Sequence, residues 1–122
     1  MPDALKKIAF QGVPGAYSHM ACQAVKPNMD AIACASFEDM LNSVQDGQAT
    51  LAMVPVENST AGRVADIHHL LPESGLYIIG EHFQRVNHHL LAPRGSQIGK
   101  LKTVHSHAQG LAQCRQHIRK LG

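Results

Sequence analysis

The feature that most constrains the fold of this chain is the repeated order of a short apolar run, a polar turn and an amphipathic stretch. The apolar runs are "KKIAFQG" (6–12), "DAIACA" (30–35) and "TLAMVPV" (50–56). Runs of this length, bounded by turn residues, are typical of buried strands. Strands that alternate with helices predict an α/β fold with a buried, mainly parallel sheet and right-handed crossovers.

A helix is predicted after each of these strands. Ser18 is a candidate N-cap for the first helix, which ends before Pro27, and Ser36 is a candidate N-cap for the second, which ends before Gly47. The third helix is predicted from about 63 to 71. Apolar residues recur at helical spacing on the second helix, at Phe37, Met40, Leu41 and Val44.

The pattern changes beyond Gly75, where we place a boundary between a first lobe, 1–75, and the start of a second, 76–122. "LYIIGEHFQRVNHHLLA" (76–92) predicts two extended segments, and "KLKTVHS" (100–106) predicts a short strand. A final helix is predicted from the spacing of Leu111, Cys114, Ile118 and Leu121. Because these elements are too few to cover a second core, we expect an incomplete second lobe and a truncated chain.

Composition excludes several classes of protein. The chain has 122 residues, of which 44% are hydrophobic and 16% charged, as in one globular domain. It contains no apolar run near the ~20 residues of a membrane span and no secretory signal, so we expect a cytoplasmic protein that does not bind membranes. A net charge of +2 with interspersed signs gives no basic stripe for a nucleic acid.

The cysteines and histidines do not predict a metal site or a disulfide framework. Cys22, Cys34 and Cys114 lie far apart, which predicts reduced thiols. Nine histidines are present, but no helical H-x-x-x-H signature occurs, and no third ligand accompanies His105 and His107. We therefore predict no bound metal.

Polar clusters follow three of the predicted strands at their carboxyl ends, where open α/β sheets bind ligands. They are "QGVPGAYS" (11–18), "ENSTAG" (57–62) and "SHAQGLAQ" (106–113). Each precedes a predicted helix, whose free N–H groups and dipole favour an anion. Together the clusters predict a site for a small molecule rich in carboxylates.

Structural interpretations exist for the serines and glycines of these clusters. Ser18 and Ser106 are candidate N-caps, and Ser106 with Gln109 matches a capping box. Glycines in the first and second clusters fit ordinary turns, at Gly12, Gly15 and Gly62. The residues alone leave these alternatives open.

The second cluster contains the residue that is hardest to explain structurally. Glu57 directly follows an apolar strand, and this position predicts partial burial. A partly buried carboxylate needs a ligand or an ion pair, for which Arg63 is the candidate. Asn58 and Ser59 either bind a ligand or form a turn that starts the third helix.

Three longer stretches that contain these clusters resemble the prephenate dehydratase family. In "AFQGVPGAYSHMA" the family's G-x-x-G-x-[YF]-S segment aligns with Gly12, Gly15, Tyr17 and Ser18. In "VPVENSTAGRVADIHHLL" its P-x-E-N-S-x-x-G segment aligns with Pro55, Glu57, Asn58, Ser59 and Gly62. In "VHSHAQGLAQC" its S-H-P-Q-x-x-x-Q-C segment aligns with Ser106, His107, Gln109, Gln113 and Cys114. Ala108 departs from the family, which often has proline there.

The resemblance implies a lyase of phenylalanine biosynthesis that converts prephenate, a dianion, to phenylpyruvate with loss of water and carbon dioxide. It implies a two-lobed fold like that of type II periplasmic binding proteins, a homo-oligomer, and no cofactor, because aromatisation drives the reaction. Catalytic roles are implied for Glu57, Asn58, Ser59, Ser106 and Gln113. Substrate-binding roles are implied for Gly15, Ser18, Asn58, Ser59, Gly62, Ser106 and Gln109.

Two segments of the family are absent from these 122 residues: a Thr-Arg-Phe segment, whose threonine is the favoured proton donor, and a phenylalanine-sensing ACT domain. We therefore expect this chain alone to have a partial site and negligible turnover. The motifs do not distinguish prephenate dehydratase from arogenate dehydratase, which acts on the amino analogue. The alternative from another class is a non-catalytic, small-anion-binding lobe of the solute-receptor type.

Overall fold

The apolar runs predicted as strands form a parallel sheet in the computed structural model, which describes residues 6–59 and 62–121. Strand β1 (Lys7–Gln11) lies between β2 (Asp30–Cys34) and β3 (Leu51–Ala52). Both neighbours run parallel to β1, with Lys7 opposite Asp30 and Ala9 opposite Ala52. The predicted α/β fold with a mainly parallel sheet is therefore confirmed.

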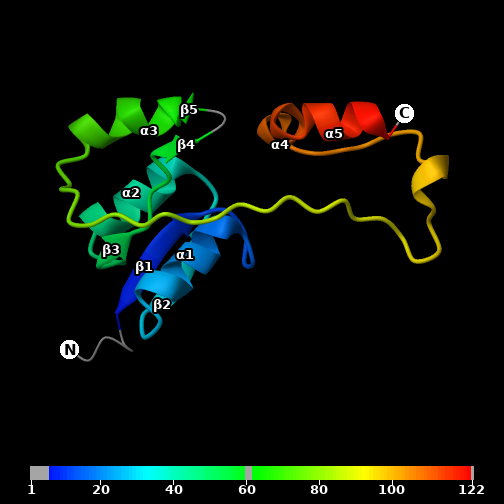
Figure 1. Ribbon diagram of the computed structural model, residues 1–122. Helices are drawn as coiled ribbons and strands as arrows, with labels where there is room; N and C mark the ends of the chain where they lie inside the picture. Colours follow the sequence, from blue (N-terminus) through cyan, green and yellow to red (C-terminus); the bar gives the residue numbers. More distant parts are fainter. Residues whose placement is uncertain (1–5, 60–61, 122) are drawn as a thin grey trace. The chain divides into compact units, whose positions relative to one another are not determined.

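Strand β1 is buried on both of its faces. Ile8 and Phe10 belong to one apolar cluster, together with Cys22 of helix α1 (Tyr17–Val25). Ala9 belongs to a second cluster that includes residues of α2 (Phe37–Gln45) and α3 (Ala65–Leu70), namely Met40, Leu41 and Ile67. Because successive side chains of a strand point to opposite faces, α1 covers one face of β1 and α2 covers the other, while α3 packs on α2 and adds Ile67 to the second cluster. Figure 1 shows these elements around β1.

The first two helices begin in different ways. At α2, the Oγ of Ser36 accepts a hydrogen bond of 3.0 Å from the backbone N–H of Asp39, which confirms the predicted N-cap. Helix α1 begins at Tyr17, and its N-cap, Ala16, makes no side-chain capping bond. The N-cap role predicted for Ser18 is therefore wrong, because Ser18 lies within the first turn of α1.

The third predicted strand is shorter than the apolar run suggests. The ladder with β1 covers only β3, although the N–H of Met53 still donates to the carbonyl of Ala9 at 2.8 Å. Pro55 follows and has no N–H to continue a ladder. A separate two-stranded sheet comes next, formed by β4 (Glu57–Asn58) and β5 (Gly62–Arg63).

The chain forms two compact units. Unit 1 comprises residues 1–57 and 63–85, and unit 2 comprises residues 58–62 and 86–122. Unit 1 contains the parallel sheet, α1, α2 and α3, and α3 leads directly into the 3-10 helix η2 (Leu71–Glu73). All of the residues that form the two buried clusters belong to unit 1.

Unit 2 contains helices and, within its described residues, no parallel ladder. Its helices are η3 (Ile98–Lys100), α4 (Ala108–Gln113) and α5 (Arg115–Lys120). The strand predicted at 100–106 is wrong: an extended segment becomes a strand only with a hydrogen-bonded neighbour, and none is described here. The single final helix is also wrong, because the helix is interrupted at Cys114, where φ is −101° and ψ is 12°.

Residues 76–92 form neither helix nor strand, although they are rich in large apolar side chains. The exposed ones are Tyr77, Ile78, Ile79, Phe83, Leu90 and Leu91. Exposed apolar residues close together in a chain often mark a surface that contacts another protein segment. None of the helices in the two described ranges combines the length and the hydropathy that a membrane span requires.

Candidate functional site

Two residues from different predicted clusters meet in unit 2. The side-chain amide of Gln113, at the end of α4, donates from Nε2 to the Oδ1 of Asn58, at the end of β4, over 3.1 Å. The two residues are 55 positions apart in the chain, and both side chains are partly buried. The structure thus brings one residue of the "ENSTAG" cluster against one residue of the "SHAQGLAQ" cluster.

A histidine extends this contact. The Nε2 of His88 is hydrogen-bonded to the Oε1 of Gln113, so that Gln113 connects His88 to Asn58. A carboxamide oxygen only accepts hydrogen bonds, and in this orientation His88 is therefore the donor. Sequence reasoning missed His88, because no motif includes it and its partner Gln113 lies 25 residues further along the chain. We call these three residues the amide relay.

Ser106 lies just before α4 and is exposed. An added Cβ on Gly110 would lie only 2.6 Å from its Oγ. Glycine at this position therefore lets the Ser106 hydroxyl approach the first turn of the helix. The predicted capping box also needs Gln109, whose side chain lies outside the described part of the chain.

The prediction that Glu57 is partly buried is wrong, because its side chain is exposed. The reason is local: β4 pairs with β5 in a sheet of two strands, instead of continuing the buried sheet. Ser59 is exposed as well. Gly62, the first residue of β5, has a φ of +83°, a conformation that favours glycine.

Gly15 and Ser18 belong to unit 1. Gly15 has a φ of +92°, and its N–H donates to the Nδ1 of His19 over 2.9 Å. The imidazole of His19 stacks on the ring of Phe10, with centroids 5.0 Å apart and planes at 6°. Because Phe10 is buried, this stack anchors the glycine loop to the core, while Ser18 lies half-buried in the first turn of α1.

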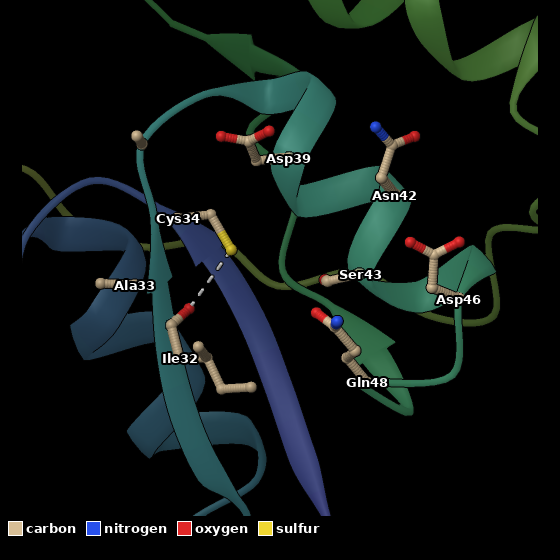
Figure 2. A pocket seen from close by; sticks show the side chains of 9 residues that line it. Ile32, Ala33, Cys34, Asp39, Asn42, Ser43, Asp46 and Gln48 are labelled. Atoms are coloured by element: carbon tan, nitrogen blue, oxygen red, sulfur yellow. Dashed lines mark hydrogen bonds between the residues drawn. The ribbon is translucent and has the colours of Figure 1, made fainter.

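A pocket in unit 1 contains none of the predicted site residues (Figure 2). It has a volume of about 480 Å³ and lies between β2 and α2. Its lining residues are Ile32, Ala33, Cys34, Ala35, Asp39, Asn42, Ser43, Asp46 and Gln48. The carboxylates of Asp39 and Asp46 would repel a dianion, so this pocket does not suit the predicted ligand.

The thiol in this pocket is not activated. Burial raises the pKa of Cys34, and the nearby carboxylate of Asp39 raises it further, while a hydrogen bond with Ser43 lowers it. The Sγ of Cys34 donates to the carbonyl of Ile32 over 3.9 Å (Figure 2). Since the thiolate is the nucleophilic form, a raised pKa disfavours nucleophilic chemistry at this position.

The described residues define an α/β protein whose candidate site is built from carboxamide and imidazole groups. Such groups bind and orient a polar ligand by hydrogen bonds, and an imidazole can also transfer a proton. The chain belongs to the prephenate dehydratase family, whose model matches residues 8–122.

Relatives of this chain come from bacteria and plants. It is 51% identical to the "Bifunctional N-acyl-homoserine lactone acylase/prephenate dehydratase" of Komagataeibacter europaeus, over 94% of this chain and 41% of that protein. It is 40% identical to "Arogenate dehydratase 2" of Petunia hybrida, over 95% of this chain and 29% of that protein. It is 36% identical to the "Bifunctional chorismate mutase/prephenate dehydratase" of Escherichia coli (strain K12), over 93% of this chain and 31% of that protein.

A solved structure described as "GqqA- a novel type of quorum quenching acylases" matches with a TM-score of 0.78 and 50% sequence identity, over 96% of this chain and 43% of that one. This chain thus spans less than half the length of the relatives named here. The family model nevertheless covers nearly all residues of this chain.

Proposed function

We propose that the protein carrying this chain is a prephenate dehydratase, which converts prephenate to phenylpyruvate with loss of water and carbon dioxide in L-phenylalanine biosynthesis. The observation that carries the proposal is the hydrogen bond between Asn58 and Gln113. It joins two motif residues that the family places far apart in sequence. Those motifs supply several neutral hydrogen-bond donors, which suit the carboxylates of a dianionic substrate.

The proposed reaction requires orientation and one proton. The carbon–oxygen bond of the ring hydroxyl breaks and the oxygen leaves as water after protonation, while the bond to the ring carboxylate breaks and its electron pair completes the aromatic ring. Glu57, Asn58 and Ser59 orient the substrate, and Ser106 and Gln113 hold it in the reactive geometry. Further contacts to the substrate are proposed for Gly15, Ser18, Gly62 and Gln109.

Asn58→Asp tests this function in the full-length protein. The substitution keeps the shape of the side chain but places a carboxylate beside a dianion, so kcat/KM for prephenate should fall by roughly a hundredfold. The matched control is Asn42→Asp, an exposed position on α2, which should leave kcat/KM unchanged. Phenylpyruvate formation is measured by absorbance, and equal rates for both variants would contradict the proposed site.

Two other assignments are compared in the same protein. An arogenate dehydratase would turn over arogenate faster than prephenate, and rates on the two substrates decide between them. A non-catalytic receptor lobe would bind prephenate with equal affinity in wild type and Asn58→Ala, without turnover, as calorimetric titration would show.

The 122-residue chain alone, which contains no Thr-Arg-Phe segment, should have negligible turnover. Measurable phenylpyruvate production by this chain would refute that expectation.

A second candidate activity is hydrolysis of N-acyl-homoserine lactones. It is supported by the relative from Komagataeibacter europaeus, 51% identical, and by the solved structure, 50% identical, since both carry an acylase in their names. Chromatographic detection of free homoserine lactone after incubation with the full-length protein tests this activity. Turnover of prephenate without release of homoserine lactone would exclude it.

The lobes, the compartment and the oligomeric state are proposed from the resemblance to the family. Residues 1–75 form the first lobe, and residues 76–122 form the start of the second lobe, of a fold like that of type II periplasmic binding proteins. The protein acts in the cytoplasm as a homo-oligomer. The exposed apolar residues between 77 and 91 support self-association. Light scattering of the full-length protein tests the oligomer, and a monomer would contradict it. Fractionation of expressing cells tests the compartment.

A further inference from the structure

We propose that His88 is a positioning residue for the site described above: through Gln113 it fixes the orientation of the Asn58 carboxamide. The inference rests on the proposed function, because it assigns His88 a part in the same reaction. His88 is itself exposed, and its Nε2 contacts the side chain of a partly buried glutamine. This role depends on the orientation of the two carboxamides of the amide relay, that is, on which partner faces the oxygen of each and which faces the nitrogen.

The amide relay has a direction. A carboxamide ends in an oxygen that accepts and a nitrogen that donates, and the two ends have nearly the same shape. Here the Oε1 of Gln113 faces His88, and its Nε2 donates to the Oδ1 of Asn58 over 3.1 Å. The Asn58 carboxamide is therefore held with its oxygen toward Gln113, which decides where its nitrogen donors point.

The imidazole of His88 selects this direction. With a proton on Nε2, the ring donates, and the Gln113 oxygen must face it. With the proton only on Nδ1, the ring would accept at Nε2, and Gln113 would have to turn its nitrogen toward His88. The Gln113 oxygen would then face Asn58, which would have to rotate as well to offer a donor. One proton position thus sets the donor and acceptor pattern that the substrate meets.

Substitutions at position 88 separate this role from general packing. Glutamine can place an N–H donor near the position of the imidazole Nε2, whereas asparagine places one near Nδ1. In the full-length protein, His88→Ala and His88→Asn should lower kcat roughly tenfold, with little change in KM, as for loss of one orienting hydrogen bond. His88→Gln should restore most of the rate. The matched control is His89→Ala, an exposed neighbour, which should be neutral.

A double-mutant comparison tests whether His88 acts through Gln113. In a Gln113→Ala background, His88→Ala should cause no further loss of kcat, because the connection to Asn58 is already broken. Independent, multiplicative losses would overturn the proposal. Equal rates for His88→Ala and His89→Ala in the wild-type background would overturn it as well.

A spectroscopic readout separates this proposal from the proposed function. In ¹⁵N-labelled full-length protein, the neutral ring of His88 should carry its proton on Nε2, and the Nε2 resonance should shift on Gln113→Ala but not on His89→Ala. An Nδ1–H tautomer, or an Nε2 resonance that is insensitive to Gln113→Ala, would refute the relay. Absence of turnover on both prephenate and arogenate would refute the proposed function, and with it the catalytic part of this inference, while the resonances still report the relay itself.

Discussion

At the scale of single residues, burial decides the chemistry of the thiol in α1. Cys22 is 1% exposed, and burial raises its pKa from 9.0 to about 11, while a backbone hydrogen bond lowers it by less. At neutral pH it is therefore a protonated, apolar member of the core. Its neighbours in the cluster are Ile8 and Phe10 of β1.

The raised pKa of Cys22 predicts a loss of stability in alkali. An unfolded thiol ionises near pH 9.0, whereas the folded thiol keeps its proton until about pH 11. The stabilisation is thus fully present below pH 9 and is lost as the pH rises through 11, by up to about 2–3 kcal/mol. Urea unfolding at pH 8 and pH 10.5 measures this loss in the free energy of unfolding. Cys22→Val, which has no titrating group, should lose less stability over this interval, and an equal loss would contradict the assignment.

Individual site residues differ in how well the sequence predicted them. Asn58 and Gln113 are predicted from their motifs, and the structure places them in contact, although their catalytic roles stay predictions. Burial of Glu57 was predicted wrongly, since its position after an apolar run does not reveal that β4 pairs with a single strand. His88 had no local signal, because its partner lies 25 residues away.

At the scale of secondary-structure elements, α2 depends on its N-cap. The Ser36 Oγ satisfies the N–H of Asp39, one of the donors that a helix start leaves without an intrahelical partner. Ser36→Ala should therefore lower the free energy of unfolding by about 1 kcal/mol. Ser36→Thr keeps the hydroxyl and should lose much less, as urea unfolding of both variants would show. Equal stability of Ser36→Ala and wild type would contradict a capping role.

Elements were predictable where their pattern is local and failed where they need a distant partner. The apolar spacing in α2 and its N-cap lie within ten residues, and both were predicted correctly. A strand needs a hydrogen-bonded neighbour, and residues 100–106 have the composition of a strand but no described neighbour. Pro55 has no N–H to donate to a ladder, and this is visible in the sequence. The apolar run nevertheless predicts a strand that crosses Pro55, whereas β3 ends at Ala52.

At the scale of the whole molecule, the two units differ in how much of their surface is buried. The buried clusters, with Ile8, Ala9 and Phe10 at their centre, belong to unit 1. In unit 2 no described residue is fully buried, and the most protected apolar side chains of α4 and α5 are partly exposed. Because burial of apolar area is the main source of stability, resistance to unfolding should be concentrated in unit 1.

Hydrogen exchange of the 122-residue chain tests this difference. Amides of β1 and α2 are bonded within a buried sheet and a capped helix, so they should exchange only when unit 1 unfolds. Amides of α4 and α5, each six residues long, should exchange at least about a hundredfold faster, because short helices in which no described residue is fully buried open locally. Mass spectrometry of peptides from the two units, compared over time, gives both rates. Equal protection of β1 and α5 would show that unit 2 is stabilised by contacts beyond those described, and would contradict a stability concentrated in unit 1.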